Sequence, residues 1–134
     1  MVQKKVFDEL TLLFDYEDTS AWTVSTHNSS IVDLATYGGY DYFNPARMQL
    51  RWPGLNSGGA ATVNFQLISD DSATPTTVIW IGPVLTLAAA KAKFMDQDWV
   101  MHLPMSDVGR YFRLNIVIGT AALTGGRLTA GLVK

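Results

Sequence analysis

The chain has 134 residues, of which 48% are hydrophobic and 16% are charged, with no cysteine and a formal net charge of -2. This length predicts a single domain, and so little charge excludes a disordered polyelectrolyte. The lack of cysteine excludes a disulfide scaffold, a thiolate metal site and a cysteine nucleophile. The acidic balance argues against a nucleic-acid partner, because nucleic-acid binding normally needs a basic excess.

The N-terminal segment, residues 1–14, contains lysines and apolar residues but lacks the features of an export signal. Asp8 and Glu9 interrupt its apolar part, whereas a signal peptide needs an unbroken apolar segment and a cleavage site. No stretch of the chain approaches the ~20 apolar residues of a membrane helix. We therefore expect synthesis in the cytoplasm, no membrane partner, and an N-terminal arm (1–14) followed by one folded domain (15–134).

Several stretches alternate between apolar and polar residues, which is typical of β-strands with one buried face. The longest are residues 61–67 and 111–118. Shorter candidates are residues 22–25, 48–52, 99–103 and 127–132. Val78–Ile81 is a continuous apolar run, which favours a strand buried on both faces.

Glycine and proline pairs separate these stretches and predict turns. Residues 119–126 lie between two alternating stretches and predict a hairpin connection. Residues 85–94, rich in alanine and lysine, fit either a short helix or a loop. The spacing predicts an all-β, single-domain antiparallel β-sandwich or jelly roll of about eight strands.

Residues that could carry catalysis or bind metal are few. His102 falls in an apolar strand pattern, which favours a partly buried strand residue, and His27 has neighbours typical of a solvated loop. Asp70 and Asp71 fit a polar turn better than a calcium site, and scattered carboxylates give no way to choose a glycosidase pair. We therefore expect no enzyme, no catalytic residues, no metal site and no cofactor.

Residues 37–52 have the most distinctive local composition, with three tyrosines, a phenylalanine, a tryptophan and two arginines. Tyrosine, tryptophan and arginine are enriched at protein interfaces, and aromatic side chains also stack on sugars or bases. The same aromatic residues could instead fill the core. Core, protein interface and ligand site therefore remain three alternatives for this segment.

Three motifs follow one another along the chain. They are Leu12-Leu13-Phe14-Asp15 with residues 30–34, the stretch 61–67 running into Ser69-Asp70-Asp71, and Gly109-Arg110-Tyr111-Phe112-Arg113-Leu114 with residues 117–120 and 129–133. In this order they resemble the jelly-roll capsid cement (decoration) proteins of short-tailed bacteriophages.

The resemblance implies a non-enzymatic structural protein of the virion. Proteins of this kind bind the outer surface of the icosahedral shell, bridge neighbouring copies of the major capsid protein and stabilise the head. The implied partners are the major capsid protein and a second copy of the chain, as a homodimer or else a trimer. The implied location is the outside of the capsid, after synthesis in the host cytoplasm.

The contacts with the shell are expected in two regions, the N-terminal arm and the aromatic segment. The expected interface residues are Lys4, Lys5, Phe7, Leu10, Tyr37, Tyr40, Tyr42, Phe43, Arg47, Arg51 and Trp52. An alternative function is a carbohydrate-binding β-sandwich module that uses exposed aromatic residues of the same segment, namely Tyr37, Tyr40, Tyr42 and Trp52.

Overall fold

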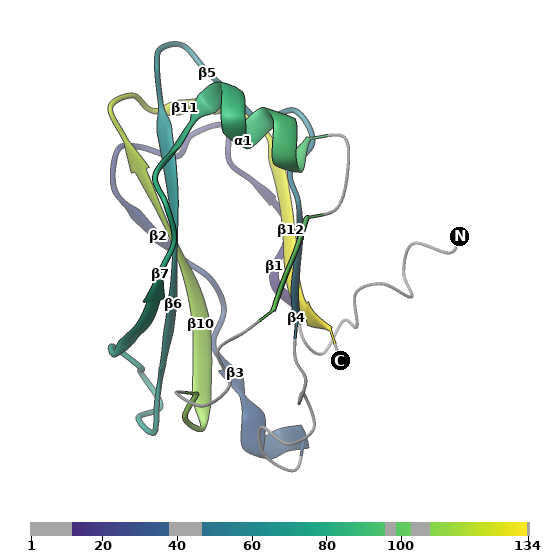
Figure 1. Ribbon diagram of the computed structural model, residues 1–134, viewed down its shortest axis with the longest axis vertical. Helices are drawn as coiled ribbons and strands as arrows, with labels where there is room; N and C mark the ends of the chain where they lie inside the picture. Colours follow the sequence, from purple (N-terminus) through teal and green to yellow (C-terminus); the bar gives the residue numbers. More distant parts are fainter. Residues whose placement is uncertain (1–11, 38–46, 96–98, 103–107, 134) are drawn as a thin grey trace, which may run out of the picture.

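The computed structural model describes residues 12–37, 47–95, 99–102 and 108–133 (Figure 1). Its strands are β1 (Leu12–Asp18), β2 (Thr26–Asn28), β3 (Val32–Asp33), β4 (Arg47–Arg51), β5 (Asn56–Ser57), β6 (Thr62–Asp70), β7 (Val78–Ile81), β8 (Leu85–Thr86), β9 (Trp99–His102), β10 (Tyr111–Gly119), β11 (Leu123–Gly125) and β12 (Arg127–Val133). Its helices are the 3-10 helix η3 (Leu34–Tyr37) and the α-helix α1 (Leu87–Phe94).

Two antiparallel sheets form the sandwich (Figure 1). The four-stranded sheet has the order β1-β12-β4-β9, and the six-stranded sheet has the order β2-β10-β6-β7, with β3 paired to β10 and β8 to β6. Strands β5 and β11 form a separate pair. The predicted all-β sandwich is confirmed, and the repeated passage of the chain between the two sheets is compatible with a jelly roll.

The core lies between the two sheets and follows the predicted alternation. In β10 the residues Phe112, Leu114, Ile116 and Ile118 are buried, while the residues between them are half-buried. The paired strand β6 buries Val63, Phe65 and Leu67 on the same side. From the opposite sheet, β4 and β12 contribute Met48, Leu50, Leu128, Ala130 and Leu132.

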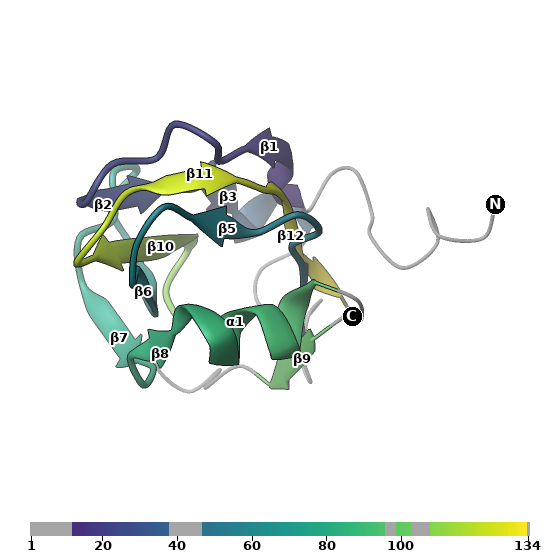
Figure 2. The ribbon, with the colours of Figure 1, turned by 90° about the horizontal axis from the view of Figure 1, so that it is seen from above.

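Helix α1 closes one end of the sandwich (Figures 1 and 2). Thr86 caps the helix, because its hydroxyl accepts a hydrogen bond from the backbone N–H of Ala89 at 3.2 Å. The ring of Phe94 is fully buried and packs edge-on against Phe65 and Trp99, with ring centroids 5.3 Å and 5.5 Å away. Residues 85–94, left open on sequence, are therefore a two-residue strand followed by a helix.

Two expectations about particular segments need correction. Residues 12–14, assigned on sequence to the N-terminal arm, form the start of β1 and pair with β12. Val78–Ile81 is not buried on both faces, because β7 lies at the end of the six-stranded sheet and pairs only with β6 within the described part of the chain.

Candidate functional site

The interface assignment of Trp52 is wrong, because this side chain belongs to the core. Trp52 is 0% exposed, and its indole N–H donates a hydrogen bond to the hydroxyl of Thr19 at 3.0 Å. Its ring lies edge-on to Trp22, with 5.8 Å between the centroids. Of the three alternatives for residues 37–52, burial in the core therefore applies to Trp52.

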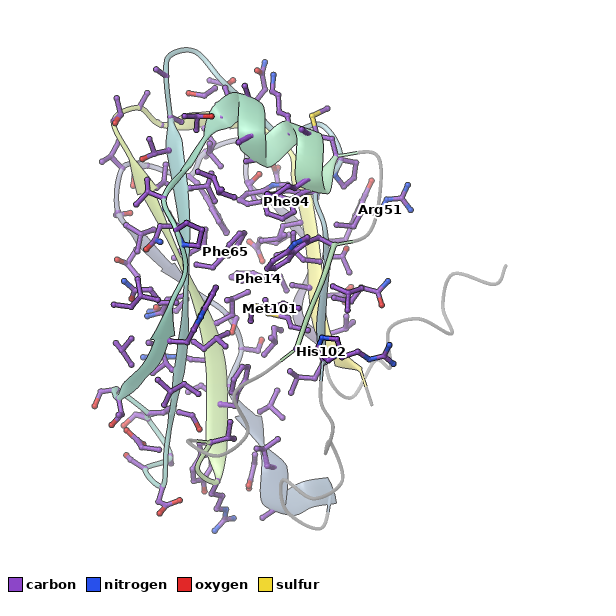
Figure 3. All side chains as sticks on the ribbon, in the orientation of Figure 1. Phe14, Arg51, Phe65, Phe94, Met101 and His102 are labelled. Atoms are coloured by element: carbon purple, nitrogen blue, oxygen red, sulfur yellow. The ribbon has the colours of Figure 1, made fainter. Side chains whose placement is uncertain are left out.

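Arg47 and Arg51 lie at the two ends of β4, on the outer face of the four-stranded sheet. Both are exposed, whereas Met48 and Leu50 between them face the core. Residues four apart on a strand share a face, and Figure 3 shows Arg51 pointing away from the sandwich. The structure thus brings together these two members of the expected interface.

Two further basic side chains lie on this outer face. His102 is exposed, pairs directly with Arg47 across β9 and β4, and points outward in Figure 3. Thr129 of β12 pairs with Arg51, so the two residues lie on the same face of the sheet. Arg127 is two residues from Thr129 on the same strand and therefore shares that face. We call Arg47, Arg51, His102 and Arg127 the basic face.

Arg127 is held in place by residues of β1 at the edge of the sheet. Its guanidinium lies 3.9 Å from the carboxylate of Asp18 and 5.2 Å from the ring centroid of Tyr16. Hydrogen bonds from Ser20 lower the pKa of Asp18, with a smaller contribution from Arg127. Asp18 therefore remains ionised beside the basic face at neutral pH.

Most of the other expected interface residues cannot be placed. Tyr37 is the last residue of η3, and its side chain is not described. Lys4, Lys5, Phe7, Leu10, Tyr40, Tyr42 and Phe43 lie outside the described residues.

His102 and His27 both differ from the sequence interpretation. His102 is exposed rather than partly buried, because it faces outward at the end of the edge strand β9. His27 belongs to β2 rather than to a loop, and its ring stacks in parallel on Trp22 with centroids 4.2 Å apart. The register pairs His27 with the inward-facing Ile116, which turns the ring toward the interior side of the sheet.

Strand β7 forms a second exposed feature, an uncharged apolar edge. Ile81 is 62% exposed and Val78 is 45% exposed, and Val84 is also exposed just beyond the strand. Exposed edge strands normally carry charges, prolines or bulges that prevent pairing with another chain. The four residues of β7 include neither a charge nor a proline, although the register of β7 with β6 shifts between Leu67 and Ile68, which leaves Ile79 without a direct partner. The exposed apolar side chains, more than a regular backbone edge, are therefore what β7 offers to a partner.

A groove lies at the opposite flank, where the edge strands β1 and β2 of the two sheets come together. Its volume is about 500 Å³, and its lining includes Asp15, Glu17, Trp22, His27 and Ser30. The sequence does not indicate this groove, because β1 and β2, which both line it, belong to different sheets. The alternation of Trp22 with polar neighbours was the only signal in the sequence.

The Asp70 carboxylate is used within its own turn. It accepts hydrogen bonds from the backbone N–H groups of Ser72, Thr76 and Thr77 and from the Thr77 hydroxyl, at 2.9–3.1 Å. These hydrogen bonds lower the pKa of Asp70 to about 2, and the bond from the Thr76 backbone N–H has the largest effect. This is the polar turn favoured on sequence over a calcium site.

The described residues include neither a cluster that could hold a metal nor a helix that could span a membrane. Within those ranges no three His, Asp or Glu side chains are grouped so that they could hold a metal ion. Neither helix that the structure describes has the length and hydrophobicity needed to cross a lipid bilayer.

Comparison with known proteins points to one family. A family model described as Bbp16 matches residues 17–132, which is most of the chain and includes strands of both sheets. The match indicates a phage-related family. No curated protein matches the chain.

Proposed function

We propose that this chain, which belongs to the Bbp16 family, is a cement protein of a phage capsid. The observation that carries the proposal is the family match over residues 17–132, because it covers nearly the whole sandwich rather than one motif. In this proposal the protein sits on the outer surface of the shell, after synthesis in the host cytoplasm. It bridges neighbouring copies of the major capsid protein and has no enzymatic activity.

The basic face is the surface that we assign to the shell. Arg47 and Arg51 project from one rigid strand, and arginine is enriched at protein interfaces because its planar fork binds carboxylates in a bidentate manner. Binding to many equivalent sites at modest individual affinity would hold neighbouring capsid subunits together. Each bound copy also favours the folded, assembled state by mass action.

A second copy of the chain is the other proposed partner, with strand β7 as the contact. Two identical antiparallel edges are self-complementary about a two-fold axis. The uncharged residues of β7 would not repel each other when paired, and Val78 and Ile81 would lose water from their exposed side chains. This arrangement favours the homodimer over the trimer.

The carbohydrate-binding alternative has less support. Trp52, one of its four aromatic residues, is buried in the core. The side chains of Tyr37, Tyr40 and Tyr42 are not among those described. No observation on the remaining described surface favours this alternative over the capsid role.

The proposal is tested by adding the purified protein to capsids assembled without it. We expect saturable binding, measured by co-sedimentation, and a higher temperature of DNA release, measured with a DNA-binding dye. Capsids that already carry the protein serve as the control and should gain no further heat resistance. Deficient capsids that bind none of the added protein and release DNA at an unchanged temperature would show the proposal to be wrong.

A further inference from the structure

The groove between β1 and β2 has one rigid aromatic wall. Trp22 is stacked in parallel on His27 at 4.2 Å and contacts Phe14 at 5.6 Å between ring centroids. The Nε2–H of His27 donates to the backbone carbonyl of Thr23 at 2.9 Å, since a carbonyl only accepts. Trp22 is only 9% exposed and supports the ring from behind, so the half-buried imidazole of His27 is the aromatic surface that the wall offers.

The other wall of the groove is acidic. Asp15 and Glu17 of β1 are exposed and line the groove. Neither carboxylate has an ion pair or hydrogen bond with another of the described residues. No lysine or arginine is among the described residues that line this groove. Its chemistry is therefore rich in acceptors and negative in charge.

We infer that this groove binds an arginine side chain presented by a protein partner. A guanidinium has five N–H donors and no acceptor, so it matches a surface that offers two carboxylates and, among its described residues, no lysine or arginine. Its planar face also stacks on aromatic rings, which an ammonium does less well. A sugar hydroxyl could donate a hydrogen bond to a carboxylate, but a neutral sugar would leave the two negative charges without a counter-charge.

The inference deepens the proposed function and rests on it for the identity of the partner, the capsid shell. It adds a second contact of opposite charge to the basic face. One copy would then offer arginines to acidic groups from its sheet face and accept an arginine on its β1–β2 flank. Two contacts of opposite sign fix the orientation of a docked protein more strictly than one.

The groove is tested with N-acetylarginine amide as the probe, titrated into the full ¹⁵N-labelled chain and followed by NMR. We expect saturable shifts of the Trp22 indole N–H and of the backbone amides of His27 and Ser30. N-acetylcitrulline amide, which has nearly the same shape without the charge, should cause none. N-acetyllysine amide should bind at least about threefold more weakly. Equal shifts with the lysine or citrulline probe, or none with arginine, would overturn the inference.

A charge-neutral variant locates the binding. Asp15→Asn with Glu17→Gln should weaken the apparent affinity for the arginine probe about fivefold, because two partly screened ion pairs are lost. Asp71→Asn, which removes a carboxylate outside the groove, should change it less than about twofold. An equal loss in both variants would indicate a general charge effect and overturn the assignment to the groove.

The capsid assay separates this inference from the proposed function. If the wild-type chain binds the arginine probe in the groove but binds no capsid, the groove stands and the cement function fails. If the chain binds capsids but the probe causes no shift at the groove, the cement function stands and the groove inference fails.

Discussion

Gly126 lies where the chain passes between Thr19 and Trp52. A Cβ at this position would be 2.6 Å from the Thr19 hydroxyl oxygen and 2.7 Å from the Trp52 indole nitrogen, the two atoms of a buried hydrogen bond. Gly126 also has a φ of 124°, a conformation that L side chains rarely adopt. Because Gly126 has no side chain, the hydrogen bond between Thr19 and Trp52 can form, and the core can pack closely around Trp52.

Gly126→Ala is expected to destabilise the protein by about 2–4 kcal/mol, from backbone strain and the displaced hydrogen bond. Chemical denaturation followed by tryptophan fluorescence measures the change. Gly58→Ala is the matched control, because its Cβ would meet only a methyl carbon of Thr124 at 3.8 Å, and it should change stability by less than about 1 kcal/mol. Equal losses in the two variants would contradict this account.

For individual residues, the sequence predicts the burial of some side chains and not of others. The alternation in residues 111–118 determines which side chains of β10 face the core, because a strand has a period of two. Trp52 follows the same alternation after Leu50, yet its aromatic neighbourhood suggested an interface. Its burial depends on Thr19 and Gly126, which are distant in the sequence, and no local pattern reports such contacts.

Strand β7 shows the same limit for a whole element. A continuous apolar run predicts that a strand exists but not its place in the sheet, because central and edge strands can have the same composition. Helix α1 was undecided on sequence because eight residues give little intrinsic helix stability. The Thr86 cap and the burial of Phe94 between the sheets decide in favour of the helix.

The uncharged, apolar edge of β7 leads to a prediction about self-association. Ile81→Lys places a charge on the exposed edge, where like charges of two paired strands would repel each other. We expect the variant to be monomeric at concentrations where the wild type is dimeric, as measured by light scattering after size-exclusion chromatography. The thermal unfolding of its monomer should be nearly unchanged, because Ile81 is 62% exposed.

Val100→Lys is the matched control for this edge. Val100 is 43% exposed on β9, which ends the other sheet. This variant should dimerise like the wild type. A dimer that persists in Ile81→Lys and dissociates in Val100→Lys would move the contact from β7 to β9 and contradict the proposed arrangement.

For the whole molecule, the distribution of charge says more than the net charge of -2. The outer face of the four-stranded sheet carries the basic face, whereas the flank between the two sheets carries Asp15 and Glu17. The net charge argues only against a nucleic-acid partner, because it does not say where on the surface the charges lie. The fold places Arg47 and Arg51 on the sheet face and Asp15 and Glu17 at the flank, with the Asp18–Arg127 pair between them. This separation of the two arginines from the two carboxylates gives the molecule a defined way to orient on a partner.

This separation makes the basic face testable on capsids. Arg47→Gln with Arg51→Gln should weaken capsid binding about tenfold at low salt, because the two side chains act together on one face. Wild-type binding should fall as the salt concentration rises, and the variant should show a smaller dependence, since charge screening acts only on the charges that remain. Co-sedimentation at several salt concentrations measures both effects, and thermal unfolding checks that the fold is kept.

Lys91→Gln with Lys93→Gln is the control that decides between a local and a general charge effect. It removes the same amount of charge from α1, at the end of the sandwich rather than on the sheet face (Figure 1). If the basic face contacts the shell, this control binds capsids nearly as well as the wild type and keeps its salt dependence. If both pairs weaken binding equally, attraction is set by total charge, and the outer face of the four-stranded sheet is not the contact.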